Sequence, residues 1–429
     1  MSPATILRRT DGRRPRERAV LAGLARGEQT PAEMEELERL ADTAGAEVVG
    51  TLLQHRGVPH PGTFLGKGKL AELHDFAARE SADLVIINDE LTPAQQRNVE
   101  RTLDLKVIDR TALVLDIFAR RARTREGRLQ VQLAQLTYLL PRLTGRGVWL
   151  SRLGGGIGTR GPGETKLEVD RRRIRDQIAV LRKEIAEISR HRSLQRRTRS
   201  EAHLPTVALV GYTNAGKSTL LNTLTSANAF VEDKLFATLD PTIRKTVLPN
   251  DRPVLLVDTV GFITRLPTQL IAAFKATLEE VTAANLLVHV IDGSHPNWKA
   301  QRNAVERVLE ELGAGDTPVV YAVNKVDLMP VAQARAIAAE LGEGVPISAQ
   351  QGLGLINLLR RVAQNLPEPL VRVKLTLPYE KAQALAQIFA EGRVLRQDYT
   401  ARGINVEAEL TRVQARQLKS VLKSPKVLQ

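Results

Sequence analysis

Apolar residues in the first part of the chain alternate between short continuous runs and helical spacing. Runs rich in Val, Leu and Ile predict three strands, at Glu47–Gln54, Asp83–Ile87 and Lys106–Ile108. Apolar residues at helical spacing predict three helices, at Glu33–Ala44, Lys69–Arg79 and Pro93–Arg101. Because alternating strands and helices favour a parallel sheet, a small α/β domain is predicted over residues 1–110.

Narrow seams of apolar residues, spaced mostly by threes and fours, dominate the next stretch. The first seam consists of Leu129, Leu133, Leu136 and Leu140. The second consists of Leu167, Ile174, Ile178, Leu181, Ile185 and Ile188. This spacing is typical of coiled coils, and the seams flank a glycine-rich segment at 154–163. The pattern predicts an antiparallel helical hairpin over residues 111–203 with a glycine tip; helices that pack on a core are the alternative.

Strands and helices alternate again from residue 204 to the prolines at 367 and 369. Five apolar strands of a mostly parallel sheet are predicted, at Thr206–Gly211, Val254–Asp258, Leu286–Ile291, Val319–Asn324 and Val345–Ser348. The remaining residues, 368–429, are predicted to form a small α+β domain. Its elements run strand, helix, strand, strand, helix, at Val371–Leu377, Glu380–Ala390, Val394–Thr400, Ile404–Leu410 and Arg412–Leu422.

Composition excludes several classes of protein. The chain has 429 residues, of which 43% are hydrophobic, and this argues against wholesale disorder. The absence of cysteine excludes disulfides, thiolate zinc sites, iron–sulfur clusters and a cysteine nucleophile. Residues 1–18 are basic without the apolar stretch of a secretory signal, and apolar runs elsewhere are too short to cross a bilayer. We therefore expect a cytoplasmic protein that requires no membrane and has at most peripheral membrane contact.

The net charge of +14 is concentrated in one region. Residues 120–200 carry 21 Lys and Arg against seven Asp and Glu, which accounts for the whole excess. Such an excess points to a polyanionic partner, either nucleic acid or an anionic membrane, although a solvated charged helix is the plain alternative. Because only 3% of residues are aromatic, recognition of a nucleic-acid backbone and shape fits better than base stacking.

The segment Gly211–Ser218 matches the phosphate-loop pattern of two glycines with four residues between them, followed by Lys-Ser. It follows a predicted strand and precedes an apolar helix, which is the context that the motif requires. Backbone N–H groups at a helix N-terminus suit phosphate oxygens. Lys217 is expected to reach the β- and γ-phosphates, and Ser218 to hold Mg²⁺.

Three further segments at strand ends define which nucleotide binds. In Asp258–Gly261 a carboxylate can support the metal and a glycine N–H can sense the γ-phosphate. In Asn324–Asp327 a carboxylate can accept hydrogen bonds from N1–H and the amine of guanine, and Ser348-Ala349 can close over the base. Together these motifs resemble those of the translation-factor-related GTPases, so a doubly wound P-loop GTPase domain that binds GTP and GDP is predicted over 204–367. The predicted nucleotide-binding residues are Gly211, Tyr212, Thr213, Asn214, Ala215, Gly216, Lys217, Ser218, Thr219, Asp258, Gly261, Asn324, Lys325, Asp327, Ser348 and Ala349.

The predicted catalytic residues are Lys217, Thr238 and Gly261. Phe262 occupies the position of the water-orienting Gln of Ras-like GTPases and cannot polarise water. A slow GTPase is therefore expected, completed either by a partner or by a monovalent cation. Asn214 resembles the potassium-coordinating Asn of certain related GTPases, although a turn residue is an equal alternative. The predicted Mg²⁺ ligands are Ser218, Thr238 and Asp258, with Asp258 acting directly or through water and Thr242 as the alternative to Thr238 in the switch I segment Phe236–Thr242.

The segment Arg152–Arg173 resembles the signature of the HflX family, whose members are ribosome-associated GTPases. Gly66–Lys69 and Leu235–Asp240 are similar to that family too. The resemblance implies a monomer whose hairpin lies along the RNA of the large ribosomal subunit and which splits stalled or idle ribosomes under stress. A role in large-subunit assembly without splitting is the alternative. The RNA contacts that it implies are Gly154, Gly155, Gly156, Gly158, Arg160, Arg171, Arg172, Arg173 and Arg175.

Overall fold

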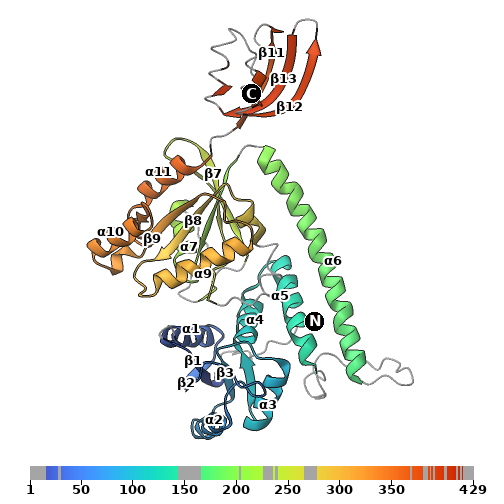
Figure 1. Ribbon diagram of the computed structural model, residues 1–429, viewed down its shortest axis with the longest axis vertical. Coiled ribbons are helices and arrows are strands. Elements are labelled where there is room, and N and C mark those ends of the chain that lie inside the picture. The colour runs from blue at the N-terminus through green and yellow to red at the C-terminus, as the bar shows by residue number, and fades with distance from the viewer. Residues whose placement is uncertain are drawn as a thin grey trace.

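A computed structural model of the chain shows three sheet-containing units, together with a long helical hairpin, among the residues it describes (Figure 1). The described residues are 16–27, 30–143, 166–201, 204–225, 235–236, 240–264, 278–367, 370–379, 385–386, 388–389, 392–400, 403–411, 414–415 and 418. Within these ranges, every helix is too short or too polar to span a bilayer.

The N-terminal unit is built on a parallel sheet of four strands in the order β2-β1-β3-β4. The strands are β1 (Arg18–Ala25), β2 (Glu47–His55), β3 (Leu84–Ile87) and β4 (Lys106–Asp109). The helices are α1 (Thr30–Thr43), α2 (Lys67–Arg79), α3 (Pro93–Leu103) and α4 (Arg110–Arg121). The predicted α/β fold is confirmed here, but the pattern missed β1. This strand lies between β2 and β3, and its buried side chains point alternately to the two faces of the sheet. Ala19 and Leu21 pack on the side of α1 and α4, whereas Val20 and Ala22 pack on the side of α2 and α3.

The predicted hairpin consists of α5 (Arg125–Leu139), the short helix η1 (Leu140–Arg142) and α6 (Lys166–Glu201). Leu136 packs against Ile174, Ile178 and Leu181 in a small apolar cluster, so the two predicted seams are in contact. The two helices are antiparallel, because Arg125 at the start of α5 pairs with Glu184 whereas Arg171 near the start of α6 donates to the carbonyl of Leu143. α6 has 36 residues and is about 54 Å long, and it runs along the side of the molecule (Figure 1).

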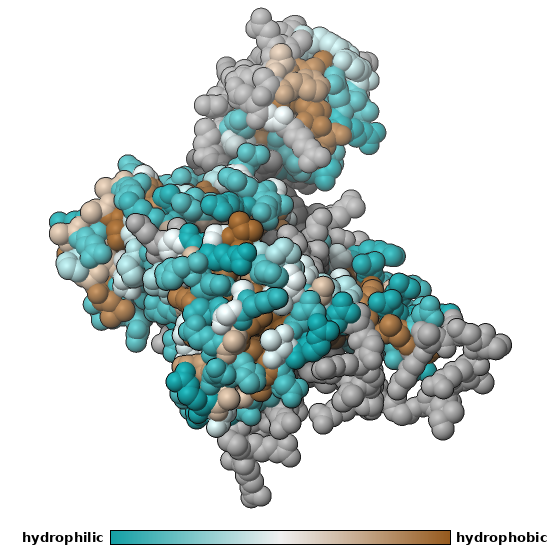
Figure 2. Space-filling view, turned by 60° about the horizontal axis from the view of Figure 1, so that its bottom comes forward, coloured by the Kyte–Doolittle hydropathy of each residue, from teal (hydrophilic) through white to brown (hydrophobic). Residues whose placement is uncertain are grey.

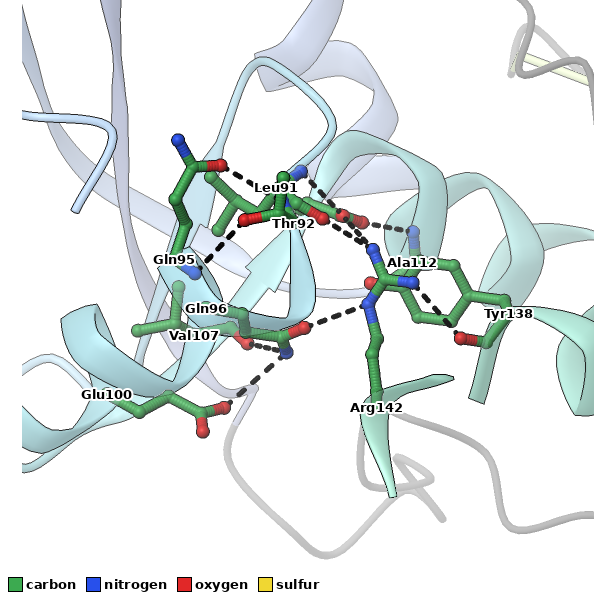
Figure 3. Close-up of polar contacts among 10 residues, drawn as sticks. Leu91, Thr92, Gln95, Gln96, Glu100, Val107, Ala112, Tyr138 and Arg142 are labelled. Carbon is green, nitrogen blue, oxygen red and sulfur yellow. Dashed lines mark hydrogen bonds and ion pairs between the residues drawn. The ribbon is translucent and has the colours of Figure 1, made fainter. Parts of the chain in front are cut away.

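A buried polar cluster fixes the end of α5 to the N-terminal unit (Figure 3). The guanidinium of Arg142 lies 3.6 Å from the centroid of the Tyr138 ring and donates to the carbonyl of Leu91 at 2.6 Å and to Gln96 Oε1 at 3.1 Å. Its Nη2 also lies 3.3 Å from Asp109 Oδ2. Asp109 is fully buried and caps α4 through the N–H of Ala112, and burial raises the pKa of its carboxyl. The cluster therefore sets where the chain leaves α5.

The nucleotide unit contains a six-stranded sheet in the order β10-β9-β8-β5-β7-β6. Its strands are β5 (Thr206–Gly211), β6 (Thr242–Val247), β7 (Pro253–Asp258), β8 (Leu286–Asp292), β9 (Val319–Asn324) and β10 (Val345–Pro346). Its helices are α7 (Lys217–Thr225), η3 (Val326–Leu328), α9 (Trp298–Glu311), α10 (Val331–Glu340) and α11 (Leu355–Asn365).

Helices cover both faces of this sheet, which confirms the doubly wound fold. Leu220 of α7 and Leu358 of α11 pack on one face, whereas Val305 of α9 and Ile337 of α10 pack on the other. β6, which the sequence pattern missed, adds an antiparallel edge strand beside β7. The phosphate-loop segment follows β5 and therefore lies at the carboxyl edge of the sheet, where doubly wound folds bind ligands. β5 lies inside the sheet, between β8 and β7.

The C-terminal unit is an antiparallel sheet of β11 (Leu370–Leu377), β13 (Gly403–Thr411) and β12 (Arg393–Thr400). Its three strands match the predicted ones, and residues 385–386, 388–389, 414–415 and 418, within the two predicted helices, are helical. Ile388 and Leu418 pack against Val406 and Ala408 in a small separate core. In the space-filling view hydrophilic residues cover most of the described surface, and apolar residues gather on this unit (Figure 2).

We expect the substitution Arg142→Met to destabilise the N-terminal unit by about 3 kcal/mol, because it leaves the buried Asp109 carboxylate without this cation. Hydrogen exchange of the β3 and β4 amides would measure the loss. Since a raised pKa lets Asp109 take up a proton as the pH falls, the loss should be smaller at pH 5 than at pH 8. Arg173→Met, at an exposed position of α6, is the control and should leave these amides unchanged.

Candidate nucleotide site

The phosphate-loop segment forms a tight turn between β5 and α7. The φ angles of Asn214 and Gly216 are 62° and 97°, in the left-handed region that glycine and asparagine tolerate best. A Cβ on Gly216 would lie 2.2 Å from Asn324 Nδ2, and one on Gly211 would lie 2.3 Å from the Val290 carbonyl oxygen. The two glycines of the motif are therefore required by close packing. The left-handed φ of Asn214 is typical of a turn residue, one of the two alternatives for this position.

Lys217 lies inside this turn and is buried. Its Nζ donates to the carbonyl oxygens of Gly211 at 3.0 Å and Tyr212 at 2.8 Å. Burial lowers the pKa of Lys217 to about 8, and the Asp258 carboxylate opposes that shift. The first turn of α7, which also contains Ser218 and Thr219, thus places a cation at the loop into which the motif is expected to bind phosphates.

Two of the predicted Mg²⁺ ligands come together. Ser218 Oγ donates to Asp258 Oδ2 at 2.6 Å, and Asp258 is almost fully buried at the end of β7. A hydroxyl and a carboxylate are the hard oxygen ligands that Mg²⁺ takes beside phosphates and water, so these residues fit the ion. Thr238, the third predicted ligand, lies outside the described residues, whereas the alternative Thr242 is the first residue of β6.

The base-reading motif is tied to the phosphate loop. Asn324 donates through Nδ2 to the Ala215 carbonyl at 2.8 Å and accepts through Oδ1 from the N–H of Ala349 at 2.9 Å. The same side chain therefore links the loop to the Ser348-Ala349 pair, in which Ser348 Oγ accepts from the N–H of Gln351. Asp327 is half-buried in η3, close along the chain to these contacts.

Asp292 is a site residue that the sequence pattern did not reveal. It ends β8, and its Oδ2 lies 2.7 Å from Nζ of Lys325, whose φ of 63° is left-handed. Its Oδ1 accepts from the N–H and hydroxyl of Ser294. Asp292 therefore holds the Lys325 side chain in place. The only available signal was an apolar strand that ends in Asp-Gly, which is also common in turns.

Gly261 and Phe262 line the other side of the loop. A Cβ on Gly261 would lie 2.8 Å from Thr213 Cγ2 and 3.1 Å from Lys217 Nζ, so only glycine fits without a shift of its neighbours. Phe262 bonds through its backbone to the phosphate-loop segment, accepting from the N–H of Thr213 at 2.7 Å and donating to the Gly211 carbonyl at 3.2 Å. Its side chain is buried in an apolar core. The Phe262 side chain is therefore held in the core, away from solvent.

The N-terminal unit also contacts the phosphate-loop segment. The Tyr212 hydroxyl donates to Glu36 of α1 and accepts from the N–H of Thr264 at 2.7 Å. Arg110, the first residue of α4, forms an ion pair with Glu36 and donates to the Thr264 carbonyl at 3.1 Å. Burial and the Glu36 carboxylate raise the pKa of Tyr212. These residues lie far apart in the sequence, which explains why the pattern gave no signal for them.

A cavity of about 240 Å³ opens between the N-terminal unit and the loop. Its lining includes Arg39 of α1, Thr213 and Asn214 of the loop, Lys325, and Arg307 of α9. The lining also includes the carboxylates of Glu33, Glu35, Glu36 and Asp292, so the cavity brings together charges of both signs from the two units.

The predicted RNA-contacting residues fall into two groups. Arg171, Arg172, Arg173 and Arg175 all lie in the first part of α6. Arg173 and Arg175 are exposed there, whereas Arg171 is half-buried and engaged with Leu143. The glycine-tip residues Gly154, Gly155, Gly156, Gly158 and Arg160 lie outside the described residues.

Three parts of the chain match known protein families. Residues 31–119 match the family described as GTP-binding GTPase N-terminal, and residues 121–199 match GTP-binding GTPase Middle Region. Residues 206–325 match the family described as 50S ribosome-binding GTPase. The three matches together span most of the N-terminal unit, the hairpin and most of the nucleotide unit.

Proteins named GTPase HflX are similar to the chain over most of its length. The one from Caldanaerobacter subterraneus subsp. tengcongensis is 51% identical over 398 residues, covering 93% of this chain and 92% of the relative. The one from Escherichia coli K12 is 42% identical over 359 residues, covering 83% and 84%. A solved GTP-binding protein from Sulfolobus solfataricus in complex with GDP covers 81% of this chain and 98% of its own, at 24% identity and a TM-score of 0.44.

The pKa of Lys217 leads to a testable pH dependence. Because phosphates favour the ammonium form, binding above about pH 8 requires uptake of a proton. We expect the affinity for GDP to fall by up to about tenfold for each pH unit above 8, with proton uptake measurable by calorimetry in buffers of different ionisation enthalpy. The variant Lys217→Met should bind more weakly and lose this decline. An equal decline in that variant would show that another group titrates.

Proposed function

The chain belongs to the HflX family of GTPases, and from that premise we propose that it hydrolyses GTP on the large ribosomal subunit and thereby dissociates stalled or idle ribosomes. The observation that carries the proposal is the long basic arm that packs against α5. α6 is about 54 Å long and presents Arg173 and Arg175 to solvent near the end that adjoins the glycine-rich segment. Arginines on such an arm suit contacts with RNA phosphates.

In the proposed reaction Lys217 binds the β- and γ-phosphates and Asp327 selects guanine. Ser218 and Asp258, with Thr238 or Thr242, would hold Mg²⁺, which when bound neutralises phosphate charge as the γ-phosphoryl group leaves. Gly261 lies directly beside Lys217 Nζ, where its N–H can report on the γ-phosphate. Because Phe262 is buried in the core, we propose that contact with the large subunit completes the site.

The arm supports a mechanism of splitting. The end of α5 is clamped by Arg142, so the chain enters the glycine-rich segment from a fixed point. A thin tip of this kind can reach a confined RNA surface, and occupation of an intersubunit surface would disfavour joining of the subunits. We propose that the protein acts as a monomer in stress-related rescue or recycling. A role in large-subunit assembly is the second candidate, because the same basic arm would serve it.

The first test compares GTP turnover by the protein alone, with large subunits, and with an equal mass of naked ribosomal RNA. We expect strong stimulation by the folded subunit only, with potassium and sodium buffers run in parallel to test Asn214 as a cation ligand. Equal stimulation by naked RNA, or none by either, would contradict the proposal. Dissociation of intact ribosomes on sucrose gradients then separates splitting from assembly, since an assembly factor would leave mature ribosomes joined.

The second test removes charge from the arm. Arg173→Gln with Arg175→Gln should weaken binding to the large subunit at least tenfold and reduce the slope of log affinity against log salt by about 2, one for each lost phosphate contact. Arg335→Gln, an exposed arginine of α10, is the matched control and should change neither value. An unchanged salt slope in the double variant would show that these side chains do not contact phosphates.

A further inference from the structure

The described residues of switch I and its flank pack against the start of the helical hairpin. Leu235 and Phe236 are almost fully buried in the core that contains α4. The Phe236 ring meets the ring of Phe118 edge-on, with 4.6 Å between centroids, and its φ of 56° is left-handed. The N-terminal end of the switch I segment is therefore held by α4, the helix that precedes α5 in the chain.

Asp240 forms a second attachment, at the N-terminus of α5. Its Oδ2 accepts from the backbone N–H groups of Arg123 at 3.0 Å and Thr124 at 2.9 Å, and its Oδ1 accepts from the Thr124 hydroxyl. Thr124 is itself the N-cap of α5, because its Oγ1 accepts from the N–H of Gly127 at 3.0 Å. A carboxylate is favoured at this end of a helix, so Asp240 extends the cap from a distant part of the chain.

Gly127 is explained by the same contact. Glycine is a poor helix former, yet Gly127 lies in the first turn of α5. A Cβ at this position would lie 2.4 Å from Asp240 Oδ1 and 3.2 Å from Thr124 Oγ1. Any larger residue would displace the carboxylate, so the glycine keeps the helix end open for a side chain of the nucleotide unit.

The hairpin beyond this joint is held together as one body. Glu126, beside Gly127, is buried and forms an ion pair with Arg192 of α6 at 2.6 Å between Nη2 and Oε2. Arg125 pairs with Glu184, and the apolar seam lies between the same two helices. A displacement of the α5 N-terminus is therefore transmitted to α6.

We propose that Asp240 is the positioning residue through which switch I and the RNA-binding arm move together. Asp240 is two residues from Thr238, the predicted Mg²⁺ ligand, and two residues span at most about 7 Å. A rearrangement of Thr238 by GTP beyond this reach would carry the N-terminus of α5 with it or break the Asp240 contacts. In the opposite direction, a partner that displaces the arm changes the placement of Thr238. This inference rests on the proposed function only in that GTP acts on switch I; it does not depend on which RNA the arm binds.

The absence of native cysteine permits a direct test with spin labels. We would place cysteines at the exposed positions Lys183 of α6 and Gln333 of α10, and measure the distance between the labels by pulsed electron resonance with GDP and with a non-hydrolysable GTP analogue. A change between the two nucleotides is expected, and Asp240→Ala should remove at least half of it. Thr92→Ala, which removes the N-cap of α3 far from switch I, is the matched control and should keep the full change.

Gly127→Ala provides a second, independent test, because its effect on the thermal midpoint should have opposite signs with and without Asp240. With Asp240 present, the added methyl group displaces the carboxylate, so the nucleotide-dependent distance change and the thermal midpoint should both fall. With Asp240→Ala, the same substitution should raise the midpoint, because alanine is the better helix former and the carboxylate no longer opposes it. A merely structural glycine would give the same sign in both backgrounds.

Binding of fluorescent GDP and of the GTP analogue by the labelled protein distinguishes a failure of the role of Asp240 from a failure of the GTP site. If both nucleotides bind but the label distance never changes, or Asp240→Ala keeps the full change, the role of Asp240 is overturned while the GTP site stands. If the analogue does not bind, the proposed function fails and the inference fails with it. Loss of stimulated turnover in Asp240→Ala, with the KM for GTP within about twofold, would support positioning.

Discussion

The guanidinium of Arg110 is the point on which the arrangement of the described units depends. It is only 4% exposed, and a buried cation requires partners. Those partners come from both units: Asn88 and Glu36 from the N-terminal sheet and helix, and the Thr264 carbonyl from the nucleotide unit. Because Glu36 also accepts from Tyr212, separation of the units would take the Thr264 carbonyl from Arg110 and the Tyr212 hydroxyl from Glu36. The apolar core continues across the same boundary from Leu113 to Phe262.

This contact joins the parallel N-terminal sheet and the mostly parallel nucleotide sheet at their carboxyl edges. Asn88 follows β3 and Arg110 follows β4, whereas Tyr212 follows β5. In doubly wound sheets this edge is where ligands bind, near the point at which the strand order reverses. In the N-terminal sheet that reversal lies beside β1, which has β2 on one side and β3 on the other. The edge faces the phosphate-loop segment, so the N-terminal unit meets the nucleotide site with the part of its fold best suited to recognition.

The hairpin is held at both ends of α5 by charges that the N-terminal and nucleotide units supply. Asp240 lies at the N-terminus of α5, and Arg142 follows its C-terminus and reaches Asp109. Asp240 accepts from the backbone N–H of Thr124, and Arg142 also donates to the Tyr138 carbonyl at 3.0 Å, so backbone groups at both ends of α5 have side-chain partners. A change in switch I therefore acts on the arm at one end, while the other end stays attached to the N-terminal sheet. Such an arrangement favours rotation of the arm over its release.

The sequence by itself determined what depends on near neighbours along the chain. The phosphate-loop motif, the strand-end motifs and the apolar spacing of the hairpin each lie within one or two elements. Periodicity therefore predicted the α/β units and the seam between α5 and α6, and motif chemistry supplied the candidate nucleotide residues. Only the tertiary structure decided the contacts between distant segments. Asp292 beside Lys325, Glu36 beside Tyr212, and Asp240 above Gly127 each join residues that no local pattern relates. β1 was missed for a similar reason: its small apolar residues become a strand because β2 and β3 flank them, and that pairing is a property of the folded sheet.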